Sequence, residues 1–416
     1  MLNTLRQALR YDSSSNPLKH MIVLHRIIGF NLSSRPAIIV SRLSMVLAGI
    51  HALCFAYRVH LVSKRDLGFQ YYIAALNVVG GYIFAVIRMT GFAWNYDSGF
   101  RGIHRFLQEH AFQRNDLRAQ RLREQCFMNN QKFTIGMLVA SVNAIMFFIL
   151  TDYRMTDQYD IPFELSFLHP TIKSVFNALF GLYLYVIATY FWIPFITLRV
   201  VIHTLCVELA IANEAFGKLF TTSSNRADLL MLHHSSNSSR SSQLTEQIRT
   251  DLFWLSLSSE LRGLVDHHRE ILINVDRLCQ LAAMPFLSET MSCILISSIS
   301  VFFLLNGESL SLVAISCVLM FESFYVSSLV EALQDVHGEM GAVVYALEWP
   351  AELRYDRRNH HHYKYVSKIL QIVLMRSQRR LRFHCGGLFE MSRGTFTFTV
   401  KTCYTMLTFL LRMQDV

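Results

Sequence analysis

Long apolar runs with few charges recur along the whole chain. The runs at residues 133–150 and 290–305 contain no charged side chain at all. A helix crosses a bilayer with about 20 mostly apolar residues, and it is the default spanning structure because it satisfies its own backbone hydrogen bonds. The pattern predicts an all-α, polytopic membrane protein with seven transmembrane helices, at residues 36–62, 67–94, 133–150, 175–200, 290–305, 309–330 and 395–411.

The segments between the runs alternate in charge, which predicts their orientation. Residues 97–132 carry seven Lys and Arg against four Asp and Glu, whereas residues 151–173 carry two against four. Residues 331–385 are again basic. Because cytoplasmic loops are enriched in Lys and Arg, the N-terminus is predicted in the cytoplasm and the C-terminus outside the cell. Lys64 and Arg65, in the short first outer loop, are the exception. This orientation is the reverse of that in G-protein-coupled receptors.

Composition and charge agree with this interpretation. The chain is 52% hydrophobic and 17% charged, against about 25% charged in a typical soluble domain. Its net charge of +9 is accounted for by the basic loops, so nucleic acid is not expected as a partner. The eight Cys residues lack zinc or disulfide spacing, and the catalytic and nucleotide-binding motifs are missing. We expect no enzyme activity, no metal and no cofactor.

Parts of the long polar segments also have helical spacing. Apolar residues recur close to the helical period in residues 252–279. We therefore expect the fourth and fifth membrane helices to continue well into the cytoplasm. In contrast, the Ser- and Asn-rich residues 221–242 predict a flexible loop, and the three His at 360–362 are predicted in a solvated loop.

A few charged and His residues lie at positions where such side chains are unusual. Arg88 and Glu322 lie inside predicted spans, where a charge needs a partner or water. Arg88 is interpreted as reaching to the inner interface, and Glu322 as either a functional coupling residue or half of a buried ion pair. His267 and His268, with Glu270, resemble a metal-binding cluster, but adjacent helical residues lie about 100° apart and converge poorly on one ion.

The C-terminal third of the chain carries an ordered series of short motifs. They are Tyr345 and Trp349, Arg376-Ser377-Gln378, Gly386-Gly387-Leu388-Phe389 with Ser392, Phe396, Lys401-Thr402, Tyr404 and Leu410-Leu411-Arg412. In order and spacing this series resembles the insect odorant receptor family, which is related to the gustatory receptors. Residues 264–278 also resemble the family's pattern before its fifth span. The first 250 residues support the resemblance only through their topology.

The resemblance implies a subunit of a tetrameric, ligand-gated, non-selective cation channel in the insect chemoreceptor fold. Such a tuning subunit forms a heterotetramer with the odorant receptor co-receptor, binds a small volatile organic ligand and contacts membrane lipid. It implies two parts: residues 1–330, with an outer-half ligand pocket among helices one to six, and residues 331–416, with a cytoplasmic anchor and a pore-lining seventh helix. The expected location is the plasma membrane of olfactory sensory neuron dendrites.

Two other functions remain open at this point. One is a gustatory receptor channel of the same fold, which can be homotetrameric. The spacing after Tyr404 is one residue longer than the usual odorant receptor ending and fits the gustatory frame with two of its residues replaced. The other is a secondary transporter, a class that often has paired internal repeats. A paired repeat is not visible in this sequence.

The outer halves of the predicted helices supply the candidate ligand-binding residues. Odorants are small and apolar, so their pocket should be aromatic with a few polar groups. For any single one of these residues, ordinary bundle packing is the more common explanation. The predicted ligand-binding set is Tyr71, Tyr72, Leu76, Asn143, Phe147, Phe148, Phe180, Tyr183, Ser297 and Val301.

The seventh helix supplies the candidate pore and gate. Apolar side chains at its outer end are predicted to close the pore by excluding water, whereas the alternative is a helix facing lipid. Arg412 either contributes charge to the pore or extends to the interface. The predicted pore and gate set is Tyr404, Leu407, Leu410, Leu411, Arg412 and Met413.

Overall fold

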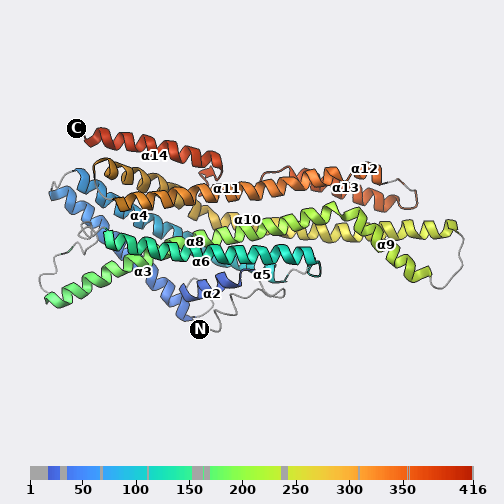
Figure 1. Cartoon of the computed structure of the whole chain (residues 1–416), viewed down its shortest axis with the longest axis horizontal. Helices are drawn as coiled ribbons and strands as arrows, with labels where there is room; N and C mark the ends of the chain where they lie inside the picture. The colour runs from blue at the N-terminus through green and yellow to red at the C-terminus, as the bar shows by residue number, and fades with distance from the viewer. Residues whose placement is uncertain are drawn as a thin grey trace.

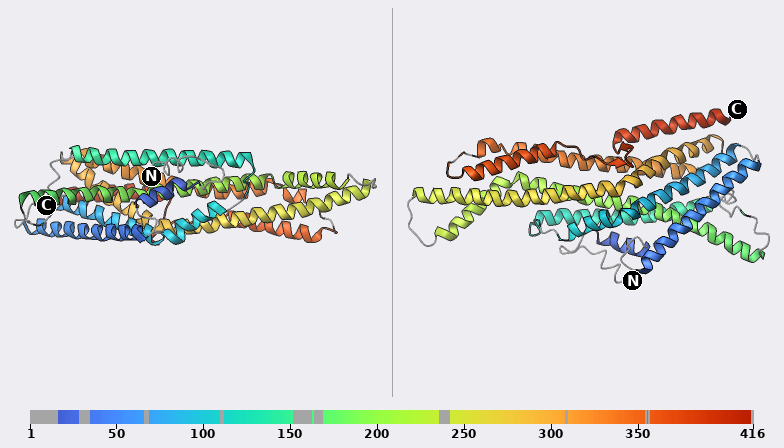
Figure 2. Two further views of the ribbon diagram at one scale, coloured as in Figure 1. Left: turned by 90° about the horizontal axis from the view of Figure 1, so that it is seen from below. Right: turned by 180° about the vertical axis from the view of Figure 1, so that it is seen from behind.

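The computed structural model is an elongated, almost entirely helical bundle, drawn in Figures 1 and 2. It describes residues 17–28, 35–65, 69–109, 112–151, 163, 169–235, 242–307, 310–353, 355 and 357–414. Within these helices, the side chains of residues 27–28, 35–38, 40–41, 65, 144–151, 181–182, 184–190, 233–235, 242–244, 310–313 and 352 lie outside the description.

Helices make up almost all of the described chain. They are α2 (Lys19–Ile28), α3 (Arg35–Arg65), α4 (Phe69–Trp94), the π-helix η1 (Tyr96–Phe100), α5 (Arg101–Glu109), α6 (Leu117–Thr151), α8 (Pro170–Gly217), α9 (Leu219–Ser235), α10 (Ser242–Leu305), α11 (Leu310–Ala346), α12 (Trp349–Glu352), α13 (His360–Ser377) and α14 (Arg393–Gln414).

Several helices are much longer than a bilayer is thick. The 64 residues of α10 span about 96 Å at 1.5 Å per residue, and α8 has 48 residues, whereas the hydrocarbon core is about 30 Å thick. Each must therefore leave the membrane and continue beyond it. This confirms that the fourth and fifth membrane helices continue well beyond the bilayer, including the helical residues 252–279, while the side on which they do so stays a prediction.

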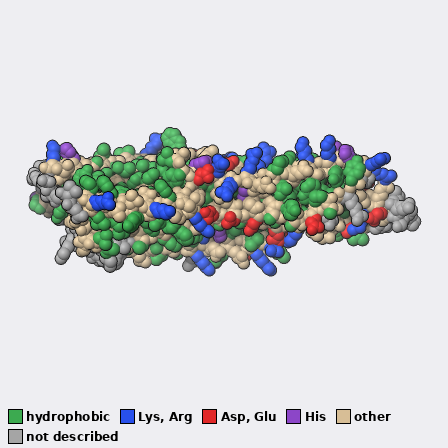
Figure 3. All heavy atoms as spheres, turned by 90° about the horizontal axis from the view of Figure 1, so that it is seen from above, with side chains coloured by type: hydrophobic (Ala, Val, Ile, Leu, Met, Phe, Trp, Pro, Cys, Tyr) green, Lys and Arg blue, Asp and Glu red, His purple; other side chains and the backbone are tan. Residues whose placement is uncertain are grey.

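Among the described helices, five are long and apolar enough to cross a membrane. They overlap the first, second, fourth, fifth and sixth predicted spans. The third predicted span lies in α6, and the seventh lies in α14. In Figure 3, hydrophobic side chains gather over one half of the long molecule, while acidic and basic side chains gather over the other half. The apolar half contains the C-terminal end of α14, so the bundle divides along its length into a membrane part and a polar part.

A short β-hairpin connects the polar part to α14. Strands β1 (His384–Cys385) and β2 (Phe389–Glu390) pair antiparallel, and the turn between them contains two glycines with positive φ, Gly386 at 57° and Gly387 at 80°. The N–H of Gly386 donates to the Ala283 carbonyl at 2.9 Å. A side chain at Gly386 would also collide with Leu287 of α10. The Gly-Gly motif thus docks the hairpin closely on α10 and fixes where α14 begins.

Two predicted loops are helices, so those predictions were wrong. Residues 221–235 belong to α9, which packs along α10 and buries Leu219 and Ala227. Arg249 of α10 adds an ion pair to Asp228 at 2.7 Å. The His run at 360–362 begins α13, where His362 Nδ1 lies 2.9 Å from Ser258 Oγ. In both places tertiary packing overrides the weak local preference of Ser, Asn and His for helix.

Candidate functional site

Five aromatic and imidazole rings meet where α3, α4 and α8 cross in the membrane part. His51 of α3 stacks on Phe180 of α8 with ring centroids 4.0 Å apart, and it lies 4.6 Å from Tyr183. Phe55 lies 4.8 Å from Tyr82 of α4 and 5.7 Å from Phe180. We call His51, Phe55, Tyr82, Phe180 and Tyr183 the outer aromatic cluster.

Polar groups are few in this cluster and are specifically placed. The Tyr183 hydroxyl donates to the Ser44 carbonyl. His51 is 6% exposed, and within the described part of the chain its Nδ1 atom has no hydrogen-bond partner. Small-molecule sites combine apolar, aromatic walls with a few such polar groups. The cluster is therefore suited to a small aromatic or aliphatic molecule with one hydrogen-bonding group.

The predicted ligand-binding residues are dispersed over three environments. Phe180 and Tyr183 join the outer aromatic cluster. Tyr71 and Tyr72 are 58% and 37% exposed on the surface of α4. Of the remaining described residues, Leu76, Ser297 and Val301 lie on α4 and α10 with their side chains buried or half-buried, and Asn143 is exposed on α6. The side chains of Phe147 and Phe148 lie outside the described residues. The ligand assignment stays a prediction.

Sequence reasoning missed three of the five cluster residues, His51, Phe55 and Tyr82. His51 and Phe55 lie four residues apart on α3, and Tyr82 lies midway along α4. An imidazole four residues before an aromatic side chain on an apolar helix was the available signal. This spacing alone does not predict the cluster, because the sequence does not show which faces of α3, α4 and α8 pack against one another.

A buried ion triad crosses the centre of the bundle. Arg88 of α4 donates from Nη1 to Glu289 Oε2 of α10 at 2.8 Å and from Nη2 to Glu322 of α11. The guanidinium also lies 4.2 Å from the ring centre of Phe191 of α8. All three charged side chains are at most 2% exposed. The triad therefore connects α4, α10 and α11 at one level.

The triad corrects the prediction for Arg88 and confirms one of the two interpretations of Glu322. Arg88 does not reach to the membrane interface, because two carboxylates hold it inside the bundle. Glu322 forms half of a buried ion pair, as one of its two interpretations stated. The second acidic partner of Arg88 is Glu289, which immediately precedes the predicted fifth span.

Helix α14 has a buried face that packs on α10. The Cys403 carbonyl accepts a hydrogen bond from Ser298 Oγ at 3.1 Å, and Cys403 Sγ lies 3.8 Å from the Cys293 carbonyl. Leu410 is buried with Phe302 and Phe303, and Leu407 and Leu411 pack against the same group. We call Thr399, Cys403 and Leu410 the buried seam of α14.

The opposite side of α14 is polar. At about 100° per residue, one set of side chains falls within about 80° of arc, centred directly opposite the buried seam. We call this set the polar face of α14; it consists of Thr397, Lys401, Thr405, Thr408 and Arg412. All are exposed except Thr408, which is half-buried. Thr405 Oγ1 donates to the Lys401 carbonyl at 3.1 Å, and Thr408 Oγ1 donates to the Thr405 carbonyl at 2.8 Å.

The structure divides the predicted pore residues between these faces. Leu410 belongs to the buried seam, and Leu407 and Leu411 are half-buried beside it. Arg412 belongs to the polar face, while Tyr404, at 69% exposed, and Met413 are also accessible. Lys401, Thr405 and Thr408 were not in the predicted set. Their recurrence at intervals of three or four residues was the available signal.

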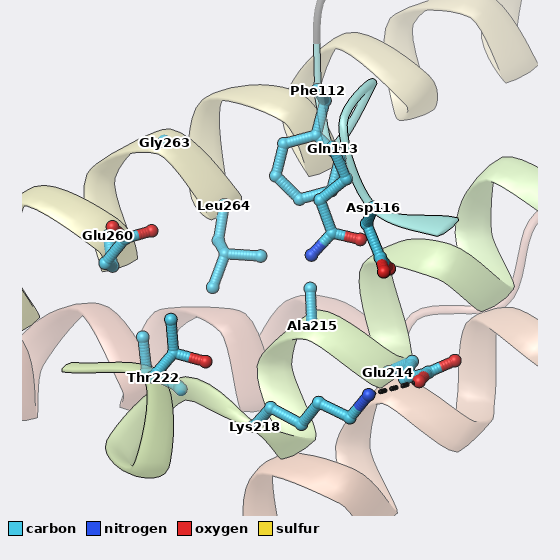
Figure 4. Close-up of a pocket in the computed structure, with 11 residues that line it drawn as sticks. Phe112, Gln113, Asp116, Glu214, Ala215, Lys218, Thr222, Glu260, Gly263 and Leu264 are labelled. Atoms are coloured by element: carbon cyan, nitrogen blue, oxygen red, sulfur yellow. Dashed lines mark hydrogen bonds and ion pairs between the residues drawn. The ribbon is translucent and has the colours of Figure 1, made fainter. Parts of the chain in front are cut away.

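A cavity of about 450 Å³ lies in the polar part of the molecule, between the end of α8, the start of α9, α10 and residues 112–116, which precede α6 (Figure 4). Leu264 and Ala215 contribute apolar surface to it. Its acidic side chains already have partners: Glu214 pairs with Lys218 at 2.5 Å and with Arg118 at 2.9 Å, Glu260 pairs with Arg226, and Asp116 accepts from the N–H groups of Arg118 and Ala119. The cavity is amphipathic without an excess of one charge.

The fold and this arrangement of helices can now be compared with known proteins. Residues 68–404 match the family described as 7tm odorant receptor. The chain belongs to the odorant receptor family. It is therefore a membrane receptor of an all-α, seven-transmembrane family and not an enzyme, as the sequence predicted.

Solved structures share the fold of this odorant receptor over nearly its whole length. The insect olfactory receptor OR5 from Machilis hrabei is 12% identical, with a TM-score of 0.68, and the match covers 95% of this chain and 97% of that one. The structure of OR5 in complex with eugenol gives a TM-score of 0.71 at 12% identity, covering 98% of both chains. No curated protein sequence is significantly similar to the chain. At this identity the likeness establishes the insect olfactory receptor fold.

Proposed function

We propose that this odorant receptor is a tuning subunit of a ligand-gated cation channel, working in a heterotetramer with the odorant receptor co-receptor. The observation that carries the proposal is the polar face of α14. A lipid-facing helix surface is apolar, whereas here Lys401 and several Thr residues stand directly opposite the seam that packs on α10. A water-filled pore is the environment that accepts such a face within a membrane.

The hydroxyl groups on this face support conduction of cations. Thr405 and Thr408 donate their protons to carbonyls of their own helix. Their oxygen lone pairs remain directed away from the backbone, and Thr397 donates in the same way to the Arg393 carbonyl at 3.1 Å. Rings of such acceptor oxygens replace part of the hydration shell of a cation.

The ligand in this proposal is a small volatile molecule that binds at the outer aromatic cluster. In this proposal the ligand opens the channel by a population shift. A ligand that binds the open arrangement of α3, α4 and α8 more tightly than the closed one favours the open arrangement. The complex of OR5 with eugenol supports a small organic ligand for this fold. The ion triad joins α4, which carries Tyr82 of this cluster, to α10, on which α14 packs.

The location and organisation follow from the same proposal. Residues 1–330 carry ligand recognition, and residues 331–416 carry the anchor and the pore helix, although α11 runs continuously across this boundary. The receptor spans the plasma membrane of olfactory sensory neuron dendrites, with its N-terminus in the cytoplasm and its C-terminus outside.

Co-expression with the co-receptor in a cell without other chemoreceptors tests the proposal. We expect an odorant panel to evoke inward cation currents that require this chain, while a co-receptor agonist opens channels with or without it. Surface-expressed receptor that gives no odorant-dependent current, alone or with the co-receptor, contradicts the proposal.

A further inference from the structure

The ammonium group of Lys401 is unusually placed for a cation channel. Lys401 lies eight residues beyond Arg393, the first residue of α14, and therefore about 12 Å along the helix axis. It is exposed at the centre of the polar face, and within the described part of the chain it forms no ion pair. By contrast, Arg393 at the start of the helix is neutralised by Glu331 at 2.7 Å.

A symmetric tetramer would repeat the Lys401 charge in every subunit. If four copies of the chain surrounded one pore, Lys401 would form a ring of four positive charges, and Arg412 would form a second ring near the outer end. Like charges in a confined, low-dielectric passage lower the local cation concentration by a factor of about ten or more. One copy among neutral or acidic neighbours would add only a single charge at each level.

We infer that Lys401 limits how many copies of this chain a conducting tetramer can contain, and that it sets the cation permeability of the mixed pore. The inference rests on the proposed channel function and deepens it. The partner it requires is a chain of the same fold that presents a neutral or acidic side chain at the level of Lys401. Arg412 contributes less, because its position at the helix end lets it extend into the aqueous interface.

Substitution of Lys401 should leave the structure of α14 intact, so that a change in conduction can be attributed to the lost ammonium group. The contact in which Lys401 stabilises α14 is made by its backbone carbonyl, which accepts from Thr405 Oγ1. Gln and Glu preserve this carbonyl and are good helix formers. A matched control is Lys132→Gln on α6, an exposed lysine on a helix that packs on α8 and α11.

The first measurement is conductance and selectivity of odorant-opened channels formed with the co-receptor. We expect Lys401→Gln to raise single-channel sodium conductance about two- to tenfold. Lys401→Glu should also shift the reversal potential toward that of Ca²⁺, while Lys132→Gln changes neither quantity. Lys401→Cys should be modified by a water-soluble, positively charged methanethiosulfonate, with a fall in current. Unchanged conductance and reversal potential, together with an unreactive Lys401→Cys, would place this side chain in lipid and overturn the inference.

The second measurement varies the ratio of the two subunits. Raising the proportion of wild-type chain at constant co-receptor should first increase and then reduce odorant current, while surface expression stays constant. With Lys401→Gln the reduction should disappear. A decline that is identical in the two chains contradicts the copy-number limit. Failure of the underlying channel proposal is distinguishable, because then odorant currents are missing at every ratio and in every variant despite surface expression.

Discussion

At the scale of single residues, the most consequential feature is the ion triad of Arg88, Glu289 and Glu322. Three charged groups lie out of water, where each unpaired charge is costly, and the guanidinium satisfies one oxygen of each carboxylate. Removing the only positive charge of this described site leaves two acids facing each other, whereas removing one acid leaves a neutral pair. The three members therefore differ in their tolerance to substitution.

We predict that Arg88→Met destabilises the receptor by about 3–5 kcal/mol, the usual cost of breaking a buried ion pair from one side. Glu289→Gln should cost much less, because an Arg–Glu pair and a hydrogen-bonding amide remain. Thermal stability of the detergent-solubilised receptor and its yield at the cell surface measure both effects. An Arg88→Met receptor as stable as Glu289→Gln would contradict this account of the triad.

The outer aromatic cluster gives a second prediction at this scale. Phe180→Ala removes the ring that stacks on His51 at 4.0 Å, so odorant sensitivity should fall at least about tenfold, as for loss of a contact worth 1.4 kcal/mol. Activation by a co-receptor agonist should remain. Phe176→Ala is the matched control, since that ring is 55% exposed on the same helix and lies outside the predicted ligand-binding set. Equal odorant dose–response curves for wild type and Phe180→Ala would remove the cluster from the ligand site.

At the scale of elements, apolar periodicity predicted the long helices well but not their faces. The helix predicted at residues 252–279 is present, because the apolar spacing there reflects packing against neighbouring helices. The polar sequence of α9 did not predict a helix, because the helical state of α9 depends on packing against α10. Likewise, the sequence predicts a helix at residues 395–411 but does not show which side of α14 packs on α10. That side is decided by contacts such as Ser298 to Cys403, and this is why Leu410 was expected in the pore.

Helix α2 illustrates a conformational sensitivity at the same scale. His25 is completely buried, with Nε2 2.8 Å from Thr197 Oγ1 and Nδ1 3.0 Å from the Tyr96 hydroxyl. Because Thr197 donates to the Ile193 carbonyl, it accepts from His25 Nε2–H, which leaves Nδ1 as an acceptor of the neutral ring. Burial lowers the pKa of His25 to about 3. Burial, helped by the charge of Arg199, lowers the pKa of His20 to about 4.

We predict that α2 detaches from the bundle in mild acid. Both His residues have depressed pKa values when α2 is docked, so docking is fully stable above about pH 6.5, the unperturbed value, and weakens as pH falls toward 4. Hydrogen exchange of residues 19–28 should therefore accelerate between pH 6.5 and 5 more than exchange in α10, after correction for intrinsic rates. His25→Gln should reduce this pH dependence. Protection of α2 that is independent of pH in this window would refute the prediction.

At the scale of the whole molecule, the separation of apolar and charged halves supports one orientation in the membrane. The apolar half contains the end of α14, and the charged half contains the junction of α8 with α9 and the first half of α10 (Figures 1 and 3). Because loops rich in Lys and Arg are retained in the cytoplasm, we expect the charged half to lie there. We then expect the C-terminus to lie outside the cell.

We therefore predict that an epitope tag after Val416 is stained by antibody on intact cells, whereas a tag before Met1 is stained only after permeabilisation. A third tag, inserted at residues 236–241 between α9 and α10, should behave like the N-terminal one, because the end of α9 and the start of α10 that flank it lie at the far end of the charged half. Each tagged receptor serves as the control for the others, provided that its odorant response is retained. N-terminal staining on intact cells would contradict this orientation. Helix α14 would then run from the outside inward, and Lys401 would lie toward the outer end of the pore.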